Sequence, residues 1–156
     1  MRIREVLTHP WLTVRTQIAL GVFFIVAALP KISDPPAFAH MVYNYRLLPG
    51  PLVNLASVTM PWAELLMGVA LICGIWRRTA ATLVGTLLVV FIVAISANLL
   101  RGNPIDCGCF DVADAGKSVE ERFHDMWFVI FRDVGMLLLV AQGLLGADRA
   151  EKNGAV

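Results

Sequence analysis

Four long runs of apolar residues dominate this chain, at about residues 14–29, 52–76, 79–100 and 126–146. A helix needs about 20 apolar residues to cross the hydrocarbon core of a bilayer, and only helices and closed barrels satisfy their backbone polar groups there. Hydrophobic residues make up 58% of the chain and charged residues 16%, a balance too apolar for a soluble domain of this size. The runs predict an all-α, polytopic membrane protein. Residues 1–150 should form one four-transmembrane-helix bundle, and residues 151–156 a flexible C-terminal tail.

The two longer connections between these runs carry helix-start signals. Pro30 is expected to close the first span, and Ser33-Asp34-Pro35-Pro36 starts a helix well. Apolar residues then recur at helical spacing, at Phe38, Met41, Val42 and Tyr45. They predict a short extracytoplasmic interfacial helix. This helix either covers the second longer connection, which contains two cysteines, or merely connects two spans. In the second connection Ser118 and Glu121 fit a capping box, so the fourth helix should begin before the membrane.

The charge distribution predicts an orientation and excludes one class of partner. The formal net charge is +1 and no basic cluster occurs, so nucleic acid is not expected as a partner. Arg77 and Arg78 occupy the tight turn between the second and third runs, whereas acids gather in the two longer connections. The positive-inside rule then predicts a multi-pass protein of the cell's inner (cytoplasmic) membrane with both termini in the cytoplasm and the longer connections outside.

Two cysteines separated by one glycine, Cys107-Gly108-Cys109, lie in the connection that follows the third run. Thiols on the extracytoplasmic side meet oxidants and can cycle between dithiol and disulfide, which favours a redox pair acting as a thiol-disulfide oxidoreductase. Cys109, beside a flexible glycine, is expected to meet the partner, and Cys107 to resolve the mixed disulfide. Asp106 and Arg101 are expected to tune the two thiols.

Two other interpretations of the cysteine pair stay open. The thiolates could hold a soft or borderline metal ion together with a nearby carboxylate or imidazole, from Asp106, Asp111 or His124. Alternatively, a disulfide could simply pin the loop. A disulfide between cysteines separated by one residue closes almost no loop, so it lowers the entropy of the unfolded chain very little and hardly stabilises the fold. The redox interpretation is therefore preferred.

Charged residues inside the predicted spans form a second candidate site. An unpaired charge in a bilayer costs about 2.5–3.5 kcal/mol on insertion scales, so Glu64 and Arg132 each need a partner. Their depths are compatible with an ion pair that joins the second span to the fourth. Alternatively they flank a pocket beneath the dithiol, lined by Trp62 and Tyr45, where a quinone headgroup could accept electrons.

A series of short stretches along the chain then forms a wider pattern. They are Lys31, Asn44-Tyr45-Arg46-Leu47-Leu48-Pro49, Pro61-Trp62-Ala63-Glu64-Leu65 with Gly68, Asp106-Cys107-Gly108-Cys109-Phe110, and Arg132-Asp133. In this order they resemble the MauE branch of the DoxX-like membrane proteins. Where that family commonly continues Cys-Gly-Cys-Phe with glycine, this chain has Asp111, which removes a flexible position and adds a negative charge.

The resemblance implies a four-helix membrane protein linked to thiol redox chemistry in the maturation of disulfide-rich proteins such as methylamine dehydrogenase. It also implies an extracytoplasmic thioredoxin-like or disulfide-containing partner, besides the lipid bilayer. The alternative is a non-catalytic membrane subunit whose Cys-Gly-Cys loop docks and stabilises a redox complex.

Overall fold

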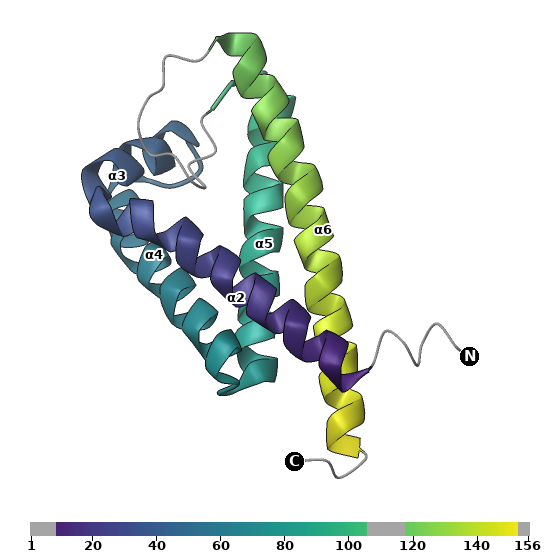
Figure 1. Ribbon diagram of the computed structural model, residues 1–156. Coiled ribbons are helices and arrows are strands. Elements are labelled where there is room, and N and C mark those ends of the chain that lie inside the picture. Colours follow the sequence, from purple (N-terminus) through teal and green to yellow (C-terminus); the bar gives the residue numbers. More distant parts are fainter. Residues whose placement is uncertain (1–8, 106–117, 153–156) are drawn as a thin grey trace.

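The computed structural model describes residues 9–105 and 118–152, and this part of the chain forms five helices (Figure 1). They are α2 (Pro10–Ser33), α3 (Pro35–Asn44), α4 (Gly50–Cys73), α5 (Arg77–Leu100) and α6 (Val119–Lys152). Helices α2, α4, α5 and α6 are each long and apolar enough to cross a membrane. The prediction of an all-α, polytopic membrane protein is confirmed.

Helix α2 does not end where the sequence predicted. Pro30 lies inside the helix, which continues to Ser33 and ends with the backbone N–H of Asp34 donating to the carbonyl of Pro30 at 3.2 Å. Proline is tolerated inside membrane helices because neighbouring elements can re-satisfy the freed backbone groups. The extra turn carries Lys31 into the interior, where the residue is only 3% exposed.

Both helix starts predicted in the connecting segments are confirmed. The side chain of Asp34 accepts a hydrogen bond from the backbone N–H of Ala37 at 3.1 Å and so caps α3. At the start of α6, the N–H of Ser118 donates to Glu121 at 2.8 Å, and the N–H of Glu121 donates back to the Ser118 hydroxyl at 3.3 Å. This reciprocal pair is the capping box, which satisfies backbone donors that the first helical turn leaves free.

Helices α2 and α4 cross at two facing glycines. A Cβ built on Gly21 would lie 2.6 Å from the carbonyl oxygen of Gly68, and one built on Gly68 would lie 2.8 Å from that of Gly21. Such contacts are too short for any other residue without a backbone shift. Close approach of backbones is how helices associate in lipid, because no hydrophobic driving force acts between them there.

The helices enclose two apolar clusters. The larger lies among α2, α4, α5 and α6 and includes Leu20, Phe24, Met67, Leu71, Val84, Leu88, Met136 and Val140. The smaller joins α5 and α6 to the end of α3 and to the residue that precedes Asp106: its members are Tyr45, Ile95, Ile105, Met126 and Val129. Helices α4 and α5 meet at their shared turn and diverge toward the end of the bundle that α3 covers (Figure 1).

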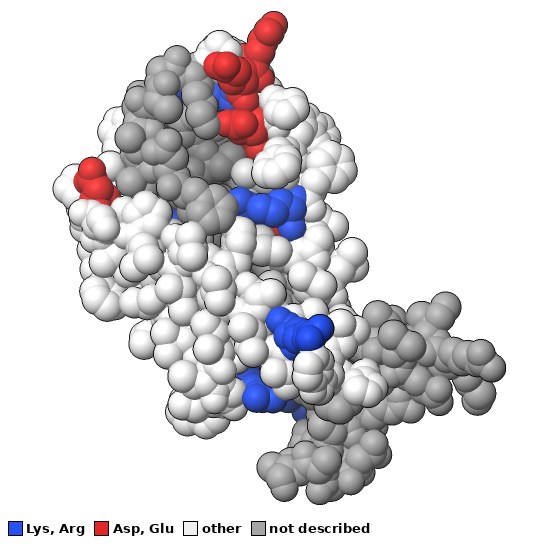
Figure 2. All heavy atoms as spheres, viewed as in Figure 1, with Lys and Arg blue, Asp and Glu red and all other residues white. Residues whose placement is uncertain are grey.

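Charge is distributed unevenly over the visible face of the molecule (Figure 2). Acidic side chains gather at the end where α3 and α6 begin, and the exposed ones there are Asp34, Glu120 and Glu121. Among the described residues, the charged side chains visible toward the opposite end of this face are basic.

Replacing Gly68 with alanine should destabilise the bundle by about 1–3 kcal/mol, because the added methyl group collides with backbone and must push α2 and α4 apart. Gly135→Ala is the matched control, since its Cβ would meet nothing within 4 Å. Thermal unfolding of both variants in the same detergent checks this. Equal melting temperatures for the two variants would show that the α2–α4 crossing tolerates a wider spacing.

Candidate functional site

The predicted redox residues Asp106, Cys107, Gly108 and Cys109 lie outside the described residues. The structure does place the residues on either side of them. Ile105 is 3% exposed and packs in the cluster with Tyr45, Ile95, Met126 and Val129. On the far side, the capping box at Ser118 begins α6. The described residues that flank this segment, Ile105 and Ser118, therefore lie at the same end of the bundle (Figure 1).

A buried asparagine joins α5 to the loop after α3. Asn98 is 0% exposed, and its Nδ2 donates to the carbonyl oxygens of Tyr45 at 3.2 Å and Ala94 at 3.0 Å. Its Oδ1 accepts from Nδ2 of Asn103 at 3.1 Å. An asparagine with its donors and acceptor used in this way is well accommodated in an apolar interior. Sequence analysis missed Asn98, although an amide within an uncharged apolar run was a usable signal.

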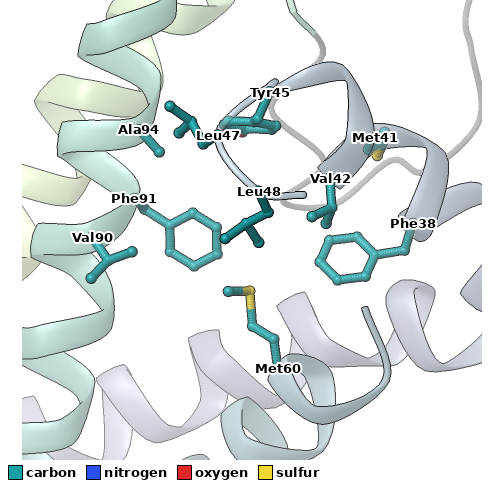
Figure 3. Close-up of a pocket in the computed structure, with 10 residues that line it drawn as sticks. All are labelled: Phe38, Met41, Val42, Tyr45, Leu47, Leu48, Met60, Val90, Phe91 and Ala94. Carbon is teal, nitrogen blue, oxygen red and sulfur yellow. The ribbon is translucent and has the colours of Figure 1, made fainter. Parts of the chain in front are cut away.

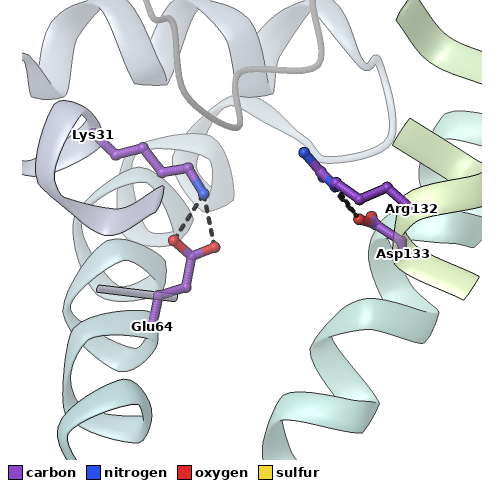
Figure 4. Close-up of polar contacts among 4 residues, drawn as sticks. All are labelled: Lys31, Glu64, Arg132 and Asp133. Atoms are coloured by element: carbon purple, nitrogen blue, oxygen red, sulfur yellow. Dashed lines mark hydrogen bonds and ion pairs between the residues drawn. The ribbon is translucent and has the colours of Figure 1, made fainter. Parts of the chain in front are cut away.

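Lys31 and Glu64 form a buried ion pair between α2 and α4. Nζ of Lys31 donates to Oε1 of Glu64 at 2.8 Å and to Oε2 at 2.7 Å, and the residues are 3% and 1% exposed (Figure 4). The predicted pairing of Glu64 with Arg132 is wrong. The physical reason is the continuation of α2 through Pro30, which brings an ammonium group onto α4 that the sequence analysis had placed in a loop.

Arg132 is paired within its own helix. Its Nε and Nη2 donate to Oδ1 of the adjacent Asp133 at 2.9 and 2.7 Å. Asp133 is 2% exposed, and the Arg132 guanidinium lies 5.1 Å from the ring centre of Phe23 on α2. The charge of Arg132 is thus balanced by its neighbour in sequence and further stabilised by an aromatic face.

The two ion pairs face one small cavity of about 20 Å³, which Lys31, Glu64, Arg132 and Asp133 all line. Glu64 and Arg132 therefore line the same cavity, but as members of separate ion pairs and not as partners of each other. Two cations and two anions cancel in charge, which lowers the cost of holding them in a bilayer. We call this group the charged tetrad. Its cavity is large enough for about one water molecule.

A second, apolar pocket of about 150 Å³ lies between α3, the loop after it, α4 and α5 (Figure 3). It is lined by Phe38, Met41, Val42, Tyr45, Leu47, Leu48, Met60, Val90, Phe91 and Ala94. Tyr45 lines this pocket, which is not the predicted one: the pocket expected from the sequence is flanked by Glu64 and Arg132, and Tyr45 does not line the cavity between those residues. Trp62 is 52% exposed on α4 and lines neither this pocket nor the tetrad cavity. Arg101, at the end of α5, is exposed.

The metal interpretation is not tested by the described part of the chain. Among residues 9–105 and 118–152 no three His, Cys, Asp or Glu side chains are grouped so as to hold an ion. His124, one candidate ligand, is exposed on α6. The other candidates, Asp106 and Asp111, lie outside the described residues.

Comparison with known proteins identifies the family. The family model for the methylamine utilisation protein MauE matches residues 9–146, which covers all four spans. The chain belongs to the MauE family. It is 34% identical over 91% of its length to the MauE protein of Methylorubrum extorquens, 73% of which is covered. It is 34% identical to that of Paracoccus denitrificans, over 92% of this chain and 75% of the relative, and 36% identical to that of Paracoccus versutus, over 94% and 77%. No solved structure matches the chain.

Removing one member of the Lys31–Glu64 pair should destabilise this MauE protein by about 3–5 kcal/mol, because the remaining charge is left buried without a partner. Lys31→Met and Glu64→Met each test this, and the double variant should cost less than the sum of the two. Thermal or denaturant unfolding of the three variants gives the coupling energy.

The same cycle run on Glu64 and Arg132 is the control. Its coupling should be smaller, because each of these residues has its own partner in the structure. A larger coupling between Glu64 and Arg132 than between Glu64 and Lys31 would restore the pairing that the sequence predicted.

Proposed function

We propose that this MauE protein is a membrane thiol-disulfide redox protein that acts through Cys107 and Cys109 in the maturation of a disulfide-containing partner. The observation that carries the proposal is the burial of Ile105, at 3% exposed, one residue before the Asp-Cys-Gly-Cys segment. A reactive dithiol needs a defined position from which to meet a partner. Burial of Ile105 and the α6 capping box provide such positions at the two ends of the segment.

The chemistry is disulfide exchange. A thiolate of the pair attacks a disulfide of the partner, forms a mixed disulfide and releases one partner thiolate; the second cysteine then attacks the mixed bond and releases the other. Cys109 is the proposed attacking residue and Cys107 the resolving one. The exchange conserves electrons, because the partner disulfide is reduced as the Cys107–Cys109 disulfide forms, and the same steps in reverse oxidise the partner.

The partner class follows from the family. Relatives carry the name methylamine utilization protein, and the resemblance in sequence links the family to methylamine dehydrogenase, whose maturation involves disulfides. A thioredoxin-like protein outside the cytoplasm is the proposed exchange partner. Asp106 and Arg101 are proposed to tune the thiols through their opposite charges.

The proposed orientation places the cysteine segment outside the cytoplasm. The acidic residues at the α3 end of the bundle and the basic residues at the opposite end support this, since cations are retained on the cytoplasmic side (Figure 2). An extracytoplasmic dithiol would also escape the reducing cytosol.

Single cysteine variants test the exchange. In a Cys73→Ser background, Cys107→Ser should accumulate a mixed disulfide with one defined protein, because the resolving thiol is missing. Cys109→Ser should accumulate far less. Non-reducing electrophoresis followed by mass spectrometry of the adduct measures both.

Two results would decide against this mechanism. If Cys109→Ser traps the partner and Cys107→Ser does not, the roles of the two thiols are reversed. If the double variant Cys107→Ser/Cys109→Ser still supports partner maturation at the wild-type level, the protein is a docking subunit and no exchange occurs.

Thiol labelling tests the orientation. A membrane-impermeant maleimide added to reduced, intact spheroplasts should label Cys107 or Cys109, while Cys73, at the opposite end of α4 from α3, stays unlabelled until the membrane is permeabilised. Cys73 is exposed on the protein surface, so protection would come from the membrane and not from burial. Labelling of Cys73 alone would invert the topology.

A further inference from the structure

The apolar pocket beneath α3 continues into a second apolar pocket between α4 and α5. The second pocket has a volume of about 400 Å³ and is lined by Ala63, Leu66, Met67, Leu83, Thr86, Leu87 and Val90. Val90 lines both pockets, so the two adjoin on α5. We call the two pockets together the α4–α5 groove.

The groove follows one face of each helix. Its lining residues keep the spacing of three and four residues that places side chains on a single helix face. They are Leu83, Thr86, Leu87, Val90, Phe91 and Ala94 on α5, and Met60, Ala63, Leu66 and Met67 on α4. From Leu83 to Ala94 the groove is about 16 Å long at the helical rise of 1.5 Å per residue. That is about half of the ~30 Å hydrocarbon core, which is the depth that one acyl chain fills in one leaflet.

The chemistry of the groove suits a hydrocarbon chain. Its lining side chains are apolar except for the hydroxyls of Tyr45 and Thr86, and the Thr86 hydroxyl already donates to the carbonyl of Thr82 at 2.9 Å. Leu66, Leu83 and Val90 are exposed on the surface of their spans. The groove is therefore open toward the lipid and not toward water.

An arginine lies at the α3 end of the groove. Arg46 stands in sequence between Tyr45 and Leu47, which both line it. Asn98 binds the carbonyl of Tyr45, which places Arg46 near the end of α5, at the depth where lipid headgroups begin. Arg46 is exposed and makes no ion pair within the described part of the chain.

The backbone at Arg46 is also unusual. Its φ is 51°, in the left-handed region that residues other than glycine seldom adopt. Such positions often coincide with ligand-binding sites. A guanidinium group there could bind phosphate, because its fork of N–H donors matches phosphate oxygens.

We propose that the α4–α5 groove binds one acyl chain of an anionic phospholipid whose phosphate is held by Arg46. The length and apolar lining of the groove match the chain, and the unpaired charge of Arg46 matches the headgroup. A free phosphate would leave the groove empty, and an uncharged lipid would leave the arginine without a partner. The bound lipid joins α3, α4 and α5 where these helices leave space between them, and the site does not depend on the proposed function.

Native mass spectrometry of the full-length protein in detergent, titrated with dioleoyl phosphatidylglycerol, tests the groove. The wild-type protein should bind one lipid tightly before any weaker ones. Val90→Trp fills the groove where its two pockets meet and should weaken this first binding about tenfold or more. Val93→Trp, on the same helix but in neither lining, is the matched control and should bind as the wild type does. Equal affinities of the two variants, or a wild-type protein without a first tight site, would overturn the proposal.

A second groove variant guards against misfolding. Ala63→Phe fills the groove from an exposed position on α4 and should reduce binding in the same way. Thermal unfolding gives an independent readout, because a ligand of the folded state raises its melting temperature. Phosphatidylglycerol should stabilise the wild type and Val93→Trp but neither groove variant. Equal stabilisation of all four proteins would overturn the site.

The headgroup contact is tested by removing one charge at each end of the bundle. Arg46→Gln should weaken binding of phosphatidylglycerol about tenfold and leave binding of dioleoylglycerol, which has the same chains and no phosphate, unchanged. Arg15→Gln, at an exposed arginine near the start of α2, is the control and should have no effect. Equal losses in the two variants would show nonspecific attraction and overturn the contact.

Glycerol 3-phosphate distinguishes a lipid site from a phosphate site. It carries the same phosphate without chains, so it should not displace bound phosphatidylglycerol at millimolar concentration. Displacement would show that the arginine binds phosphate alone and that the groove contributes nothing, which would overturn the proposal.

Discussion

The pairing of Lys31 with Glu64 is the interaction on which the rest of this structure depends. In a bilayer neither charge is tolerable alone, so the end of α2 must lie against α4 at the depth of Glu64. The Gly21–Gly68 crossing sets the spacing of the same two helices farther along. Since Asp34 caps α3 directly after α2 ends, the position of Lys31 also determines where α3 begins and which face of the bundle it covers.

The helices and their starts could be predicted from sequence because their signals are local. The apolar runs, the Asp34 cap and the Ser118–Glu121 box each depend on a few adjacent residues, and all are confirmed. The ion pairing could not be predicted in the same way. It depends on whether α2 continues past Pro30 and on how each helix is rotated about its axis. Both are determined by contacts with the neighbouring helices and not by local sequence. Gly68 was noticed only as part of a motif, because its role requires a second glycine that faces it across the crossing.

For the candidate site, the sequence predicts a chemistry for the cysteine pair, and the structure places only the surrounding residues. The Cys-Gly-Cys pair is recognisable in the sequence because two cysteines separated by a single residue can react with each other only if the backbone bends sharply, and the glycine permits this bend. Tyr45 lines the apolar pocket and not the cavity between Glu64 and Arg132, and Trp62 on α4 is half exposed. Both are aromatic residues near a membrane end, and periodicity alone does not separate an aromatic that lines a pocket from one at the lipid surface. Asn98 illustrates the opposite case, a buried polar side chain whose partners lie in a loop distant in sequence.

The packing of the bundle is uneven: two helices are in close backbone contact, whereas two others leave a pocket between them. Helices α2 and α4 touch through glycine backbones, while α4 and α5, although joined by a short turn, enclose a 150 Å³ pocket together with α3. A void among apolar side chains forfeits dispersion contacts, and filling it would need only larger residues at positions such as Ala94. The Lys31 ammonium lies 5.3 Å from the centres of two of the rings that line the void, those of Phe38 and Phe91. The buried ion pair and the open side of the bundle are therefore separated by these two rings, and Phe91 lines both the void and the cavity of the charged tetrad.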